Sequence, residues 1–264
     1  MKYADPYQKL AIVYDLMSAD RHSEQMTEYC RSIFNRLKIQ PQRGLDLCCG
    51  TGTAIEIFTD WGITMSGLDG SSSMLAVAAR KLKGRGVKLY HKRLPKFRLL
   101  DRDRPVPVTF DLVTSFYDSL NYIQTQKDLR ATFRSVAEHL EPGGWFIFDM
   151  NTEAALTQIW GGQVYADAHE DIAWVWKNDY DARRHRATCQ TTCFYREGTH
   201  WARFDELHTE RAYPNETIVK LLKATGFEVR GLYNCGTFRK PTRNCYRIAV
   251  VARKRTGGPR LGGC

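Results

Sequence analysis

An aspartate and two glycines stand close together in the stretch Gly44-Leu-Asp-Leu-Cys-Cys-Gly-Thr-Gly-Thr53. The apolar residues predict a strand, and the glycines that follow let the backbone turn tightly and approach a ligand where a helix begins. A nicotinamide dinucleotide site would have a third glycine at the position of Ile55. Asp46, four residues before Gly50, suits a cofactor that carries a cationic amino group instead.

A second carboxylate, Asp69, ends the next apolar segment in Gly67-Leu-Asp-Gly-Ser71. At a strand end, a carboxylate can accept hydrogen bonds from both hydroxyls of a ribose, and such charge-assisted bonds contribute about 1.5–3 kcal/mol each. Asp69 could alternatively cap the helix expected from Ser73. The glycine loop upstream favours the role in binding.

A third group with chemical potential is the run Phe204-Asp-Glu-Leu-His-Thr-Glu-Arg211. On a strand, Glu206, His208 and Glu210 share one face, and Arg211 belongs to the opposite face. A histidine beside carboxylates can titrate near neutral pH and act as a base. The alternative is a polar row that faces solvent.

Strands and helices alternate over the first 150 residues. Helical spacing covers 6–37, strands are predicted at 44–48, 63–69, 87–91, 110–116 and 145–150, and helices at 53–61, 73–82 and 126–140. Glu141-Pro-Gly-Gly144 is expected to end the last helix and turn the chain into the next strand. This alternation indicates an α/β fold whose parallel sheet is covered by helices on both faces.

The pattern changes after residue 150. Strands at 172–180, 187–195 and 201–213 predict an inserted antiparallel sheet, after which a helix at 215–225 and strands at 227–233 and 245–253 resume the α/β pattern. We therefore expect a main domain from residues 1–150 and 213–253, with an N-terminal helical lid. Residues 151–212 would form an inserted β cap that binds substrate, and 254–264 a disordered basic tail.

The chain resembles the class I S-adenosylmethionine (SAM)-dependent methyltransferases from about Tyr7 to Lys254. The resemblance rests on the two glycine-containing motifs above, on Leu140-Glu-Pro-Gly-Gly144, and on Asp111-Leu-Val with its sequel Phe116-Tyr-Asp-Ser-Leu-Asn-Tyr122. It is closest to the small-molecule branch, which includes sugar N-methyltransferases. The resemblance implies a Rossmann-like, doubly wound seven-stranded sheet with SAM as cofactor.

By this resemblance the glycine loop holds the methionine end of SAM and Asp69 the ribose. The segment from Tyr7 to Met17 would close over the site, with Tyr14 nearest the methyl donor. The implied cofactor residues are Asp46, Cys48, Gly50, Gly52, Thr53, Asp69, Gly70, Met74, Arg93, Ser115, Phe116 and Tyr117. Two positions depart from the family pattern: Cys48 replaces a glycine, and Arg93 stands where an acid usually binds the adenine amino group. A backbone group or His91 would then contact adenine.

Methyl transfer from a sulfonium is an in-line displacement, so we expect no metal, and catalysis by alignment of the two reactants. Glu206 and His208 are the predicted groups that bind or deprotonate the acceptor, and Tyr14 is the third predicted catalytic residue. The predicted acceptor ligands are Asp118, Asn121, Tyr122 and Arg211. The chain has no Asn-Pro-Pro-Tyr run of the kind that marks methylation of the exocyclic amines of nucleobases or of protein amides. These observations favour a small-molecule acceptor methylated on nitrogen or oxygen.

The net charge of +10 is concentrated in two segments. Residues 80–104 contain eleven Lys or Arg against two Asp, and residues 239–260 contain eight Lys or Arg and no acid. Such segments could steer an anionic partner, so an RNA methyltransferase is an alternative, although no appended RNA-binding module is evident. A SAM-binding protein without catalysis is a further alternative.

The remaining features bear on compartment and assembly. No apolar run approaches the roughly 20 residues that cross a bilayer, and Asp5 and Pro6 stand where a signal peptide would be apolar. The eight cysteines show no paired C-x-x-C spacing, so reduced thiols are expected and a zinc site is not. We predict a cytoplasmic monomer or homodimer without membrane contact.

Overall fold

The computed structural model describes residues 3–17, 21–101 and 106–257, and its main feature is a seven-stranded sheet. The strand order is β10-β11-β5-β4-β1-β2-β3. The strands are β1 (Arg43–Leu47), β2 (Thr64–Asp69), β3 (Lys88–His91), β4 (Phe110–Ser115), β5 (Leu140–Asn151), β10 (Phe227–Asn234) and β11 (Arg247–Lys254). β11 pairs antiparallel with both β5 and β10, whereas β1 to β5 pair in parallel.

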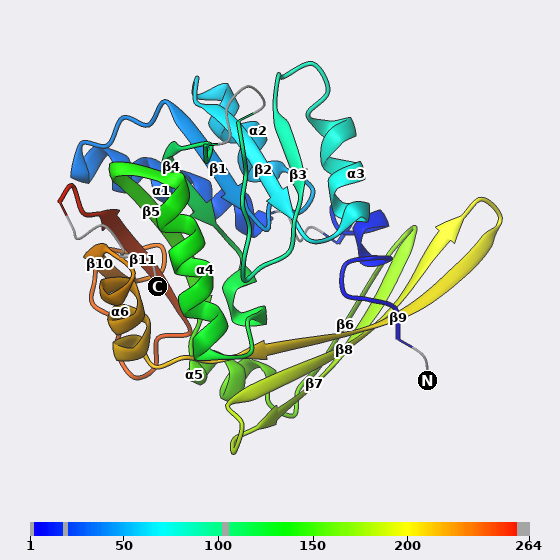
Figure 1. Ribbon diagram of the computed structural model, residues 1–264. Coiled ribbons are helices and arrows are strands. Elements are labelled where there is room, and N and C mark those ends of the chain that lie inside the picture. Colours follow the sequence, from blue (N-terminus) through cyan, green and yellow to red (C-terminus); the bar gives the residue numbers. More distant parts are fainter. Residues whose placement is uncertain (1–2, 18–20, 102–105, 258–264) are drawn as a thin grey trace.

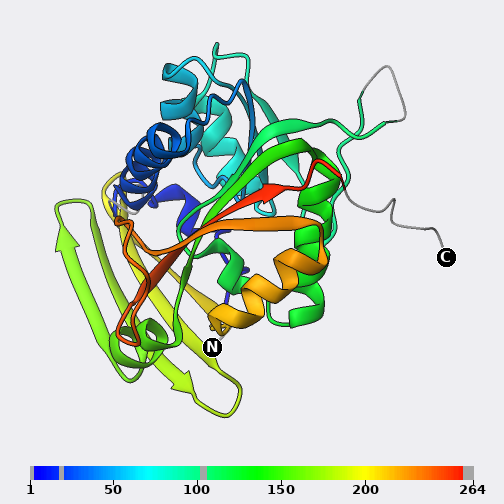
Figure 2. The same ribbon diagram turned by 90° about the vertical axis from the view of Figure 1, so that its left-hand side faces the viewer.

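Helices cover both faces of this sheet because its strands are apolar on both sides. In β5, Phe146 and Phe148 pack with α4 (Gln126–His139) and α6 (Asn215–Ala224), whereas Ile147 packs on the opposite face. That face carries α1 (Arg21–Leu37), α2 (Thr53–Asp60) and α3 (Ser72–Lys81). Figure 2 shows α4 and α6 on one side of the sheet and α1 on the other. The expected α/β, Rossmann-like sheet is confirmed.

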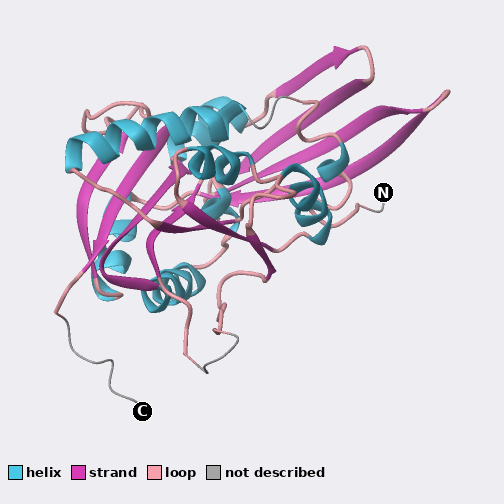
Figure 3. Ribbon diagram, turned by 90° about the horizontal axis from the view of Figure 1, so that it is seen from above, coloured by secondary structure: helices cyan, strands magenta, loops and turns pink. Residues whose placement is uncertain are grey.

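A separate four-stranded antiparallel sheet lies beside the main one, in the order β6-β7-β8-β9 (Figures 1 and 3). Its strands are β6 (Val164–His169), β7 (Ile172–Asp181), β8 (Arg186–Glu197) and β9 (His200–Arg211). The three long strands match the expected meander. The edge strand β6 was not predicted, and all its residues are exposed, so it lacks the apolar periodicity that identifies a strand. A short α5 (Glu153–Ala155) and a π-helical turn η3 (Leu156–Trp160) join the two sheets.

The prediction of helix from residue 6 onward is wrong for residues 6–17, the part before α1 that the structure describes, where a short 3-10 turn, η1 (Leu10–Ile12), forms instead. The amides of Tyr7, Lys9 and Leu10 donate to the carboxylate of Glu206 on β9 instead of forming helical bonds. Ala4 also bridges to Glu206 beside the edge of the small sheet. Residues 4–17 therefore connect the two sheets, and we call this segment the strap (Figure 1).

The Glu141–Gly144 turn is part of β5 and not a separate loop. β5 pairs with β4 through Phe110 and Leu140, and then again from Leu112 and Trp145 after a shift in register. Gly143 takes a positive φ of 84° there, which accommodates the irregularity. The predicted basic tail lies mostly at 258–264, outside the described residues.

Candidate functional site

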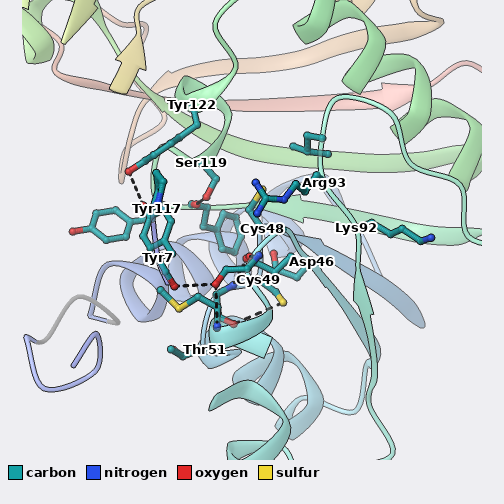
Figure 4. Close-up of a pocket in the computed structure, with 18 of the residues that line it drawn as sticks. Tyr7, Asp46, Cys48, Cys49, Thr51, Lys92, Arg93, Tyr117, Ser119 and Tyr122 are labelled. Carbon is teal, nitrogen blue, oxygen red and sulfur yellow. Dashed lines mark hydrogen bonds between the residues drawn. The ribbon is translucent and has the colours of Figure 1, made fainter. Parts of the chain in front are cut away.

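A cavity of about 490 Å³ opens at the carboxyl ends of β1 and β2 (Figure 4). The turn after β1 lines it, and Cys48, Gly50 and Gly52 all take positive φ, at 55°, 53° and 86°. An added Cβ on Gly52 would lie 2.8 Å from Leu82 of the α3 segment, so the loop packs too closely for a side chain there. Cys48 adopts the left-handed conformation that a glycine would adopt, which accommodates its departure from the family pattern.

Asp69 ties this turn to the end of β2. Its Oδ2 accepts from the Gly50 amide at 2.9 Å, and its Oδ1 from the Ser71 amide at 2.7 Å. Burial raises the pKa of Asp69, although these amides oppose the shift. A carboxylate has about four acceptor positions, so Asp69 retains acceptor capacity toward the cavity that it lines.

Asp46 is the more deeply buried of the two acids, with 3% of its surface exposed. The Thr114 hydroxyl donates to it at 2.7 Å. Burial raises the pKa of Asp46 to about 7, despite that bond. A cationic ligand group in the cavity would favour the ionised form of this carboxyl.

Residues after β3 form another wall, and no acid from this segment lines the cavity. Arg93 lies close to Gly70, and an added Cβ on Gly70 would lie 3.1 Å from its side chain. His91 Nε2 lies 3.1 Å from the Gly70 carbonyl, so this ring already has a partner. Figure 4 shows Arg93 near Cys48, whereas Lys92 points away.

Most of the predicted cofactor residues meet in this cavity. Those that line it are Asp46, Cys48, Gly50, Thr53, Asp69, Gly70, Met74, Arg93, Phe116 and Tyr117. Gly52 lies behind the turn, and Ser115 is fully buried in β4, so neither lines it. Their contact with a cofactor stays a prediction that the geometry does not support.

A second cavity of about 310 Å³, here named the acceptor cavity, lies between the two sheets. Four tyrosines line both cavities: Tyr7, Tyr14, Tyr117 and Tyr122. Burial raises the pKa of Tyr7, Tyr14 and Tyr122 well above the ordinary value of 10.0 and that of Tyr117 to about 12. These phenols are therefore neutral and can donate hydrogen bonds but cannot act as bases near neutral pH. Tyr14, a predicted catalytic residue, stands at the junction of the cavities.

The predicted pair Glu206 and His208 lies on the buried face of β9, not toward solvent. The Tyr7 hydroxyl donates to Tyr122 at 2.7 Å, the Tyr122 hydroxyl lies 2.9 Å from His208 Nδ1, and His208 Nε2 lies 3.2 Å from Glu206. His208 lines the acceptor cavity, but Glu206 does not.

The carboxylate of Glu206 is occupied by the backbone. Burial alone would raise its pKa, but hydrogen bonds from His208 and from the amides of Leu10 and Lys9 outweigh burial and lower it. Glu206 is thus an anchor for the N-terminal strap. Its predicted role toward the acceptor gains no support from these contacts.

The predicted acceptor ligands fall into two groups. Asp118 and Tyr122 line the acceptor cavity. Asn121 instead joins the Asn151 and Arg211 carbonyls at 3.0 and 2.9 Å, and Arg211 donates to the Gln124 carbonyl at 2.6 Å. Asn121 and Arg211 therefore hold β5, η2 (Ser119–Tyr122) and β9 together outside both cavities.

A buried charge cluster supports the loop after β4, and sequence reasoning missed it. Asp149, fully buried in β5, accepts from the Tyr117 amide at 2.7 Å and pairs with Arg247 of β11. Arg247 also contacts Asp118 at 2.7 Å. Burial would raise the pKa of Asp149, but Arg247 and His22 lower it. The sequence contains one signal for this cluster, which is the acid Asp149 inside the otherwise apolar segment 145–150.

A second tether fixes the strap over the first cavity. The Thr51 hydroxyl donates to Asp15 at 2.7 Å, and Lys81 Nζ lies 2.7 Å from the same carboxylate. The Ser71 hydroxyl donates to the Tyr7 carbonyl at 2.9 Å. The glycine turn and the end of β2 therefore hold the strap directly.

Comparison with known proteins gives one consistent family. A family model described as a methyltransferase domain matches residues 22–232. The YqeM protein of Bacillus subtilis (strain 168), whose name assigns it provisionally to the methyltransferases, is 28% identical over 94% of this chain and 97% of its own length. A Streptomyces venezuelae dTDP-3-amino-3,4,6-trideoxy-alpha-D-glucopyranose N,N-dimethyltransferase is 32% identical over 66% of this chain and 63% of its own length.

Among solved structures, a SAM-dependent methyltransferase from Clostridium acetobutylicum ATCC 824 is similar to this chain. It superposes with a TM-score of 0.82 at 28% identity and covers 94% of this chain and 99% of its own. The similarity therefore includes both the seven-stranded sheet and the four-stranded one.

Proposed function

Because this chain belongs to the methyltransferase domain family and is a SAM-dependent methyltransferase, we propose that it methylates a nitrogen or oxygen atom of a small molecule bound in the acceptor cavity. The observation that carries the proposal is the pair of cavities that share four tyrosines. A cavity of about 310 Å³ is of the size that takes small molecules. Residues 151–212 would then serve as the acceptor subdomain.

The residues of the first cavity fit SAM, which supplies a methyl group on a positively charged sulfur. An added Cβ at Gly50 meets no atom within 4 Å, so the backbone of this turn faces open space. We assign Asp46 to the cationic amino group and Asp69 to the ribose hydroxyls. With Arg93 and His91 beside Gly70, backbone groups would contact the adenine.

Alignment is the main task of the protein in this reaction. Correct placement of two reactants can lower a barrier by roughly 7–11 kcal/mol at best. Tyr7, Tyr14, Tyr117 and Tyr122 form the wall through which the two cavities meet, and their neutral hydroxyls can orient an acceptor there. Glu206 acts as a positioning residue through the strap, and His208 acts through Tyr122.

The alternative of an RNA acceptor loses much of its motivation in the structure. Arg247 forms ion pairs with Asp118 and Asp149, and Arg85 forms ion pairs with Asp60 and Glu56. Lys254 donates to the Leu140 carbonyl at 2.6 Å. Arg102, Arg104 and Arg260 lie outside the described residues. Arg85, Arg247 and Lys254 therefore have partners within the fold, which removes three charges of the basic segments from the case for RNA.

The relatives also favour a small molecule. The Streptomyces venezuelae protein is by its name an N,N-dimethyltransferase of an amino sugar nucleotide. In the described part of the chain, no helix is long and apolar enough to span a membrane. The compartment, and the choice between monomer and homodimer, stay predictions.

The test is turnover of amine and alcohol metabolites, followed as release of S-adenosylhomocysteine. Thr191 is buried and lines the acceptor cavity, so Thr191→Trp fills the space. We expect this variant to bind S-adenosylhomocysteine normally and to lose turnover at least tenfold. Thr192 lies on the other face of β8, so Thr192→Trp is the matched control. Equal turnover in Thr191→Trp and the wild type would place the acceptor elsewhere.

A further inference from the structure

The acceptor cavity contains two neighbouring carboxyl groups, those of Glu210 and Asp118, of which Asp118 also pairs with Arg247. Both line the cavity, and Glu210 is fully buried on β9. Asn151 donates to Glu210 Oε2 at 2.9 Å. Glu210 Oε1 is buried and receives no hydrogen bond from an N–H or O–H donor within the described ranges.

The neighbouring acid is Asp118, whose carboxyl group interacts with that of Glu210. Two carboxyl groups can share a hydrogen bond only if one proton lies between them, or if a ligand N–H takes its place. Burial, followed by the neighbouring Asp118, raises the pKa of Glu210 well above its ordinary 4.5. Burial therefore favours the protonated form of this carboxyl pair as long as no ligand cation lies beside it.

The charges around the cavity favour a cation. Three carboxyl groups, those of Asp118, Asp149 and Glu210, stand against the guanidinium of Arg247 and the imidazole of His22, which lies 3.7 Å from Asp149. The other groups that face the cavity from neighbouring elements are His208 and Cys189 with the four shared tyrosines, none of which is a fixed cation. Trp160, Tyr165 and Trp176 add aromatic faces, which attract a cation through the ring quadrupole.

We propose, building on the function proposed above, that the acceptor is an amine that enters as an ammonium ion and gives its proton to Glu210. An ammonium nitrogen has no lone pair and cannot attack a methyl donor. The ammonium ion displaces the proton held by the carboxyl pair, and that proton leaves to solvent on binding. Transfer of one proton from nitrogen to Glu210 Oε1 leaves the electron pair on nitrogen, which then forms the bond to the methyl carbon. The bond between that carbon and sulfur breaks with its electrons retained by sulfur, and the proton stays on the carboxyl pair, which returns to its state before binding.

This assignment predicts a proton count. In this assignment the carboxyl pair holds one proton before binding, and the free amine brings another as ammonium. In the complex, the amine and Glu210 share one proton between them, wherever it resides. Binding must therefore release close to one proton to the buffer.

The experiment uses protein loaded with S-adenosylhomocysteine, with cyclohexylamine as the probe and cyclohexanol as its neutral analogue. Calorimetry at about pH 7 in phosphate and in MOPS, neither of which is a primary amine, gives the affinity and the number of protons released. We expect cyclohexylamine to bind at least tenfold more tightly than cyclohexanol, with nearly one proton released. Glu210→Gln should lose both the preference for cyclohexylamine and the proton release, and it should still bind S-adenosylhomocysteine. Glu197→Gln, at an exposed position of β8, should leave both unchanged.

The outcomes separate this inference from the function on which it rests. If cyclohexylamine and cyclohexanol bind with equal affinity and Thr191→Trp blocks both, the small-molecule site stands. The inference that the acceptor is an amine is then overturned. Binding of neither probe, with turnover of alcohols and of no amine, would also overturn the amine alone. The proton count in the wild type needs no variant, so amine binding without proton release overturns the role of Glu210 even where Glu210→Gln does not fold.

Discussion

The two cavities are built in different ways. The first cavity, which we assign to the cofactor and call the cofactor cavity, is formed by short stretches at adjacent strand ends. These are chiefly Cys48 to Gly50 and Asp69 to Ser71, and their backbone shape depends on local residue types. The acceptor cavity takes residues from the strap, the loop after β4, the π-helical turn, all four strands of the small sheet, β5 and β11. Local backbone chemistry thus specifies the first site, and long-range packing specifies the second.

The charge cluster at Asp149 is where the two sites depend on each other. Asp149→Ala would leave Arg247 buried with one carboxylate fewer and would remove the acceptor of the Tyr117 and Asp118 amides. Loss of one partner of a buried pair costs about 3–5 kcal/mol. We expect the free energy of unfolding to fall by about that amount, measured by chemical denaturation.

The control for this variant is an exposed ion pair. Asp171 pairs with Arg196 at 2.7 Å on the small sheet, with both side chains roughly half exposed. Asp171→Ala should cost less than about 1 kcal/mol. Similar losses in the two variants would mean that the Asp149 cluster does not support the loop between the cavities.

A change confined to the cofactor cavity should leave the acceptor side intact. Asp69→Ala removes the carboxylate assigned to the ribose and the acceptor of the Gly50 amide. We expect S-adenosylhomocysteine to bind about 100-fold more weakly by calorimetry, since two charge-assisted bonds of about 1.5 kcal/mol each are lost. Hydrogen exchange of β8 and β9 should not change. Asp69→Asn retains the shape of the side chain and should lose less affinity for S-adenosylhomocysteine. Undiminished affinity in Asp69→Ala would refute the assignment of Asp69 to the ribose.

The contrast between the sites explains what sequence reasoning achieved. The seven-stranded sheet and the glycine turn were predicted, because alternating apolar strands and left-handed turn positions leave local patterns. Ten of the predicted cofactor residues line the cavity for the same reason. The strap was mistaken for a helix, since its amides are satisfied by Glu206, about 200 positions along the chain. Glu210 was noticed only as a neighbour on a strand face, because its Asp118 partner depends on how the two sheets pack.

The strap joins both regions, so loosening it should affect each of them moderately. Glu206→Gln removes the negative charge to which three backbone amides donate. We expect hydrogen exchange in residues 7–13 to accelerate about tenfold, because bonds to a charged acceptor contribute about 1.5–3 kcal/mol. Asp205→Asn changes the adjacent residue on the opposite face and should leave this exchange slow. Unchanged protection in Glu206→Gln would show that the Asp15 tether alone holds the strap.

The last effect concerns the protonation of Asp46. Its pKa of about 7, raised by burial, means that the folded protein binds this proton more tightly than the unfolded chain does. The contribution of Asp46 to stability therefore decreases as the pH rises from about 4 through 7. A ligand ammonium group favours the ionised carboxyl. The affinity for S-adenosylhomocysteine should therefore increase as the pH rises from about 5.5 to 7.5, by up to about tenfold per pH unit below pH 7. Asp46→Asn should bind weakly and with a flat profile in calorimetry. A slope that persists in Asp46→Asn would assign the titration to another group, such as Asp69, and would transfer the contact with the amino group away from Asp46.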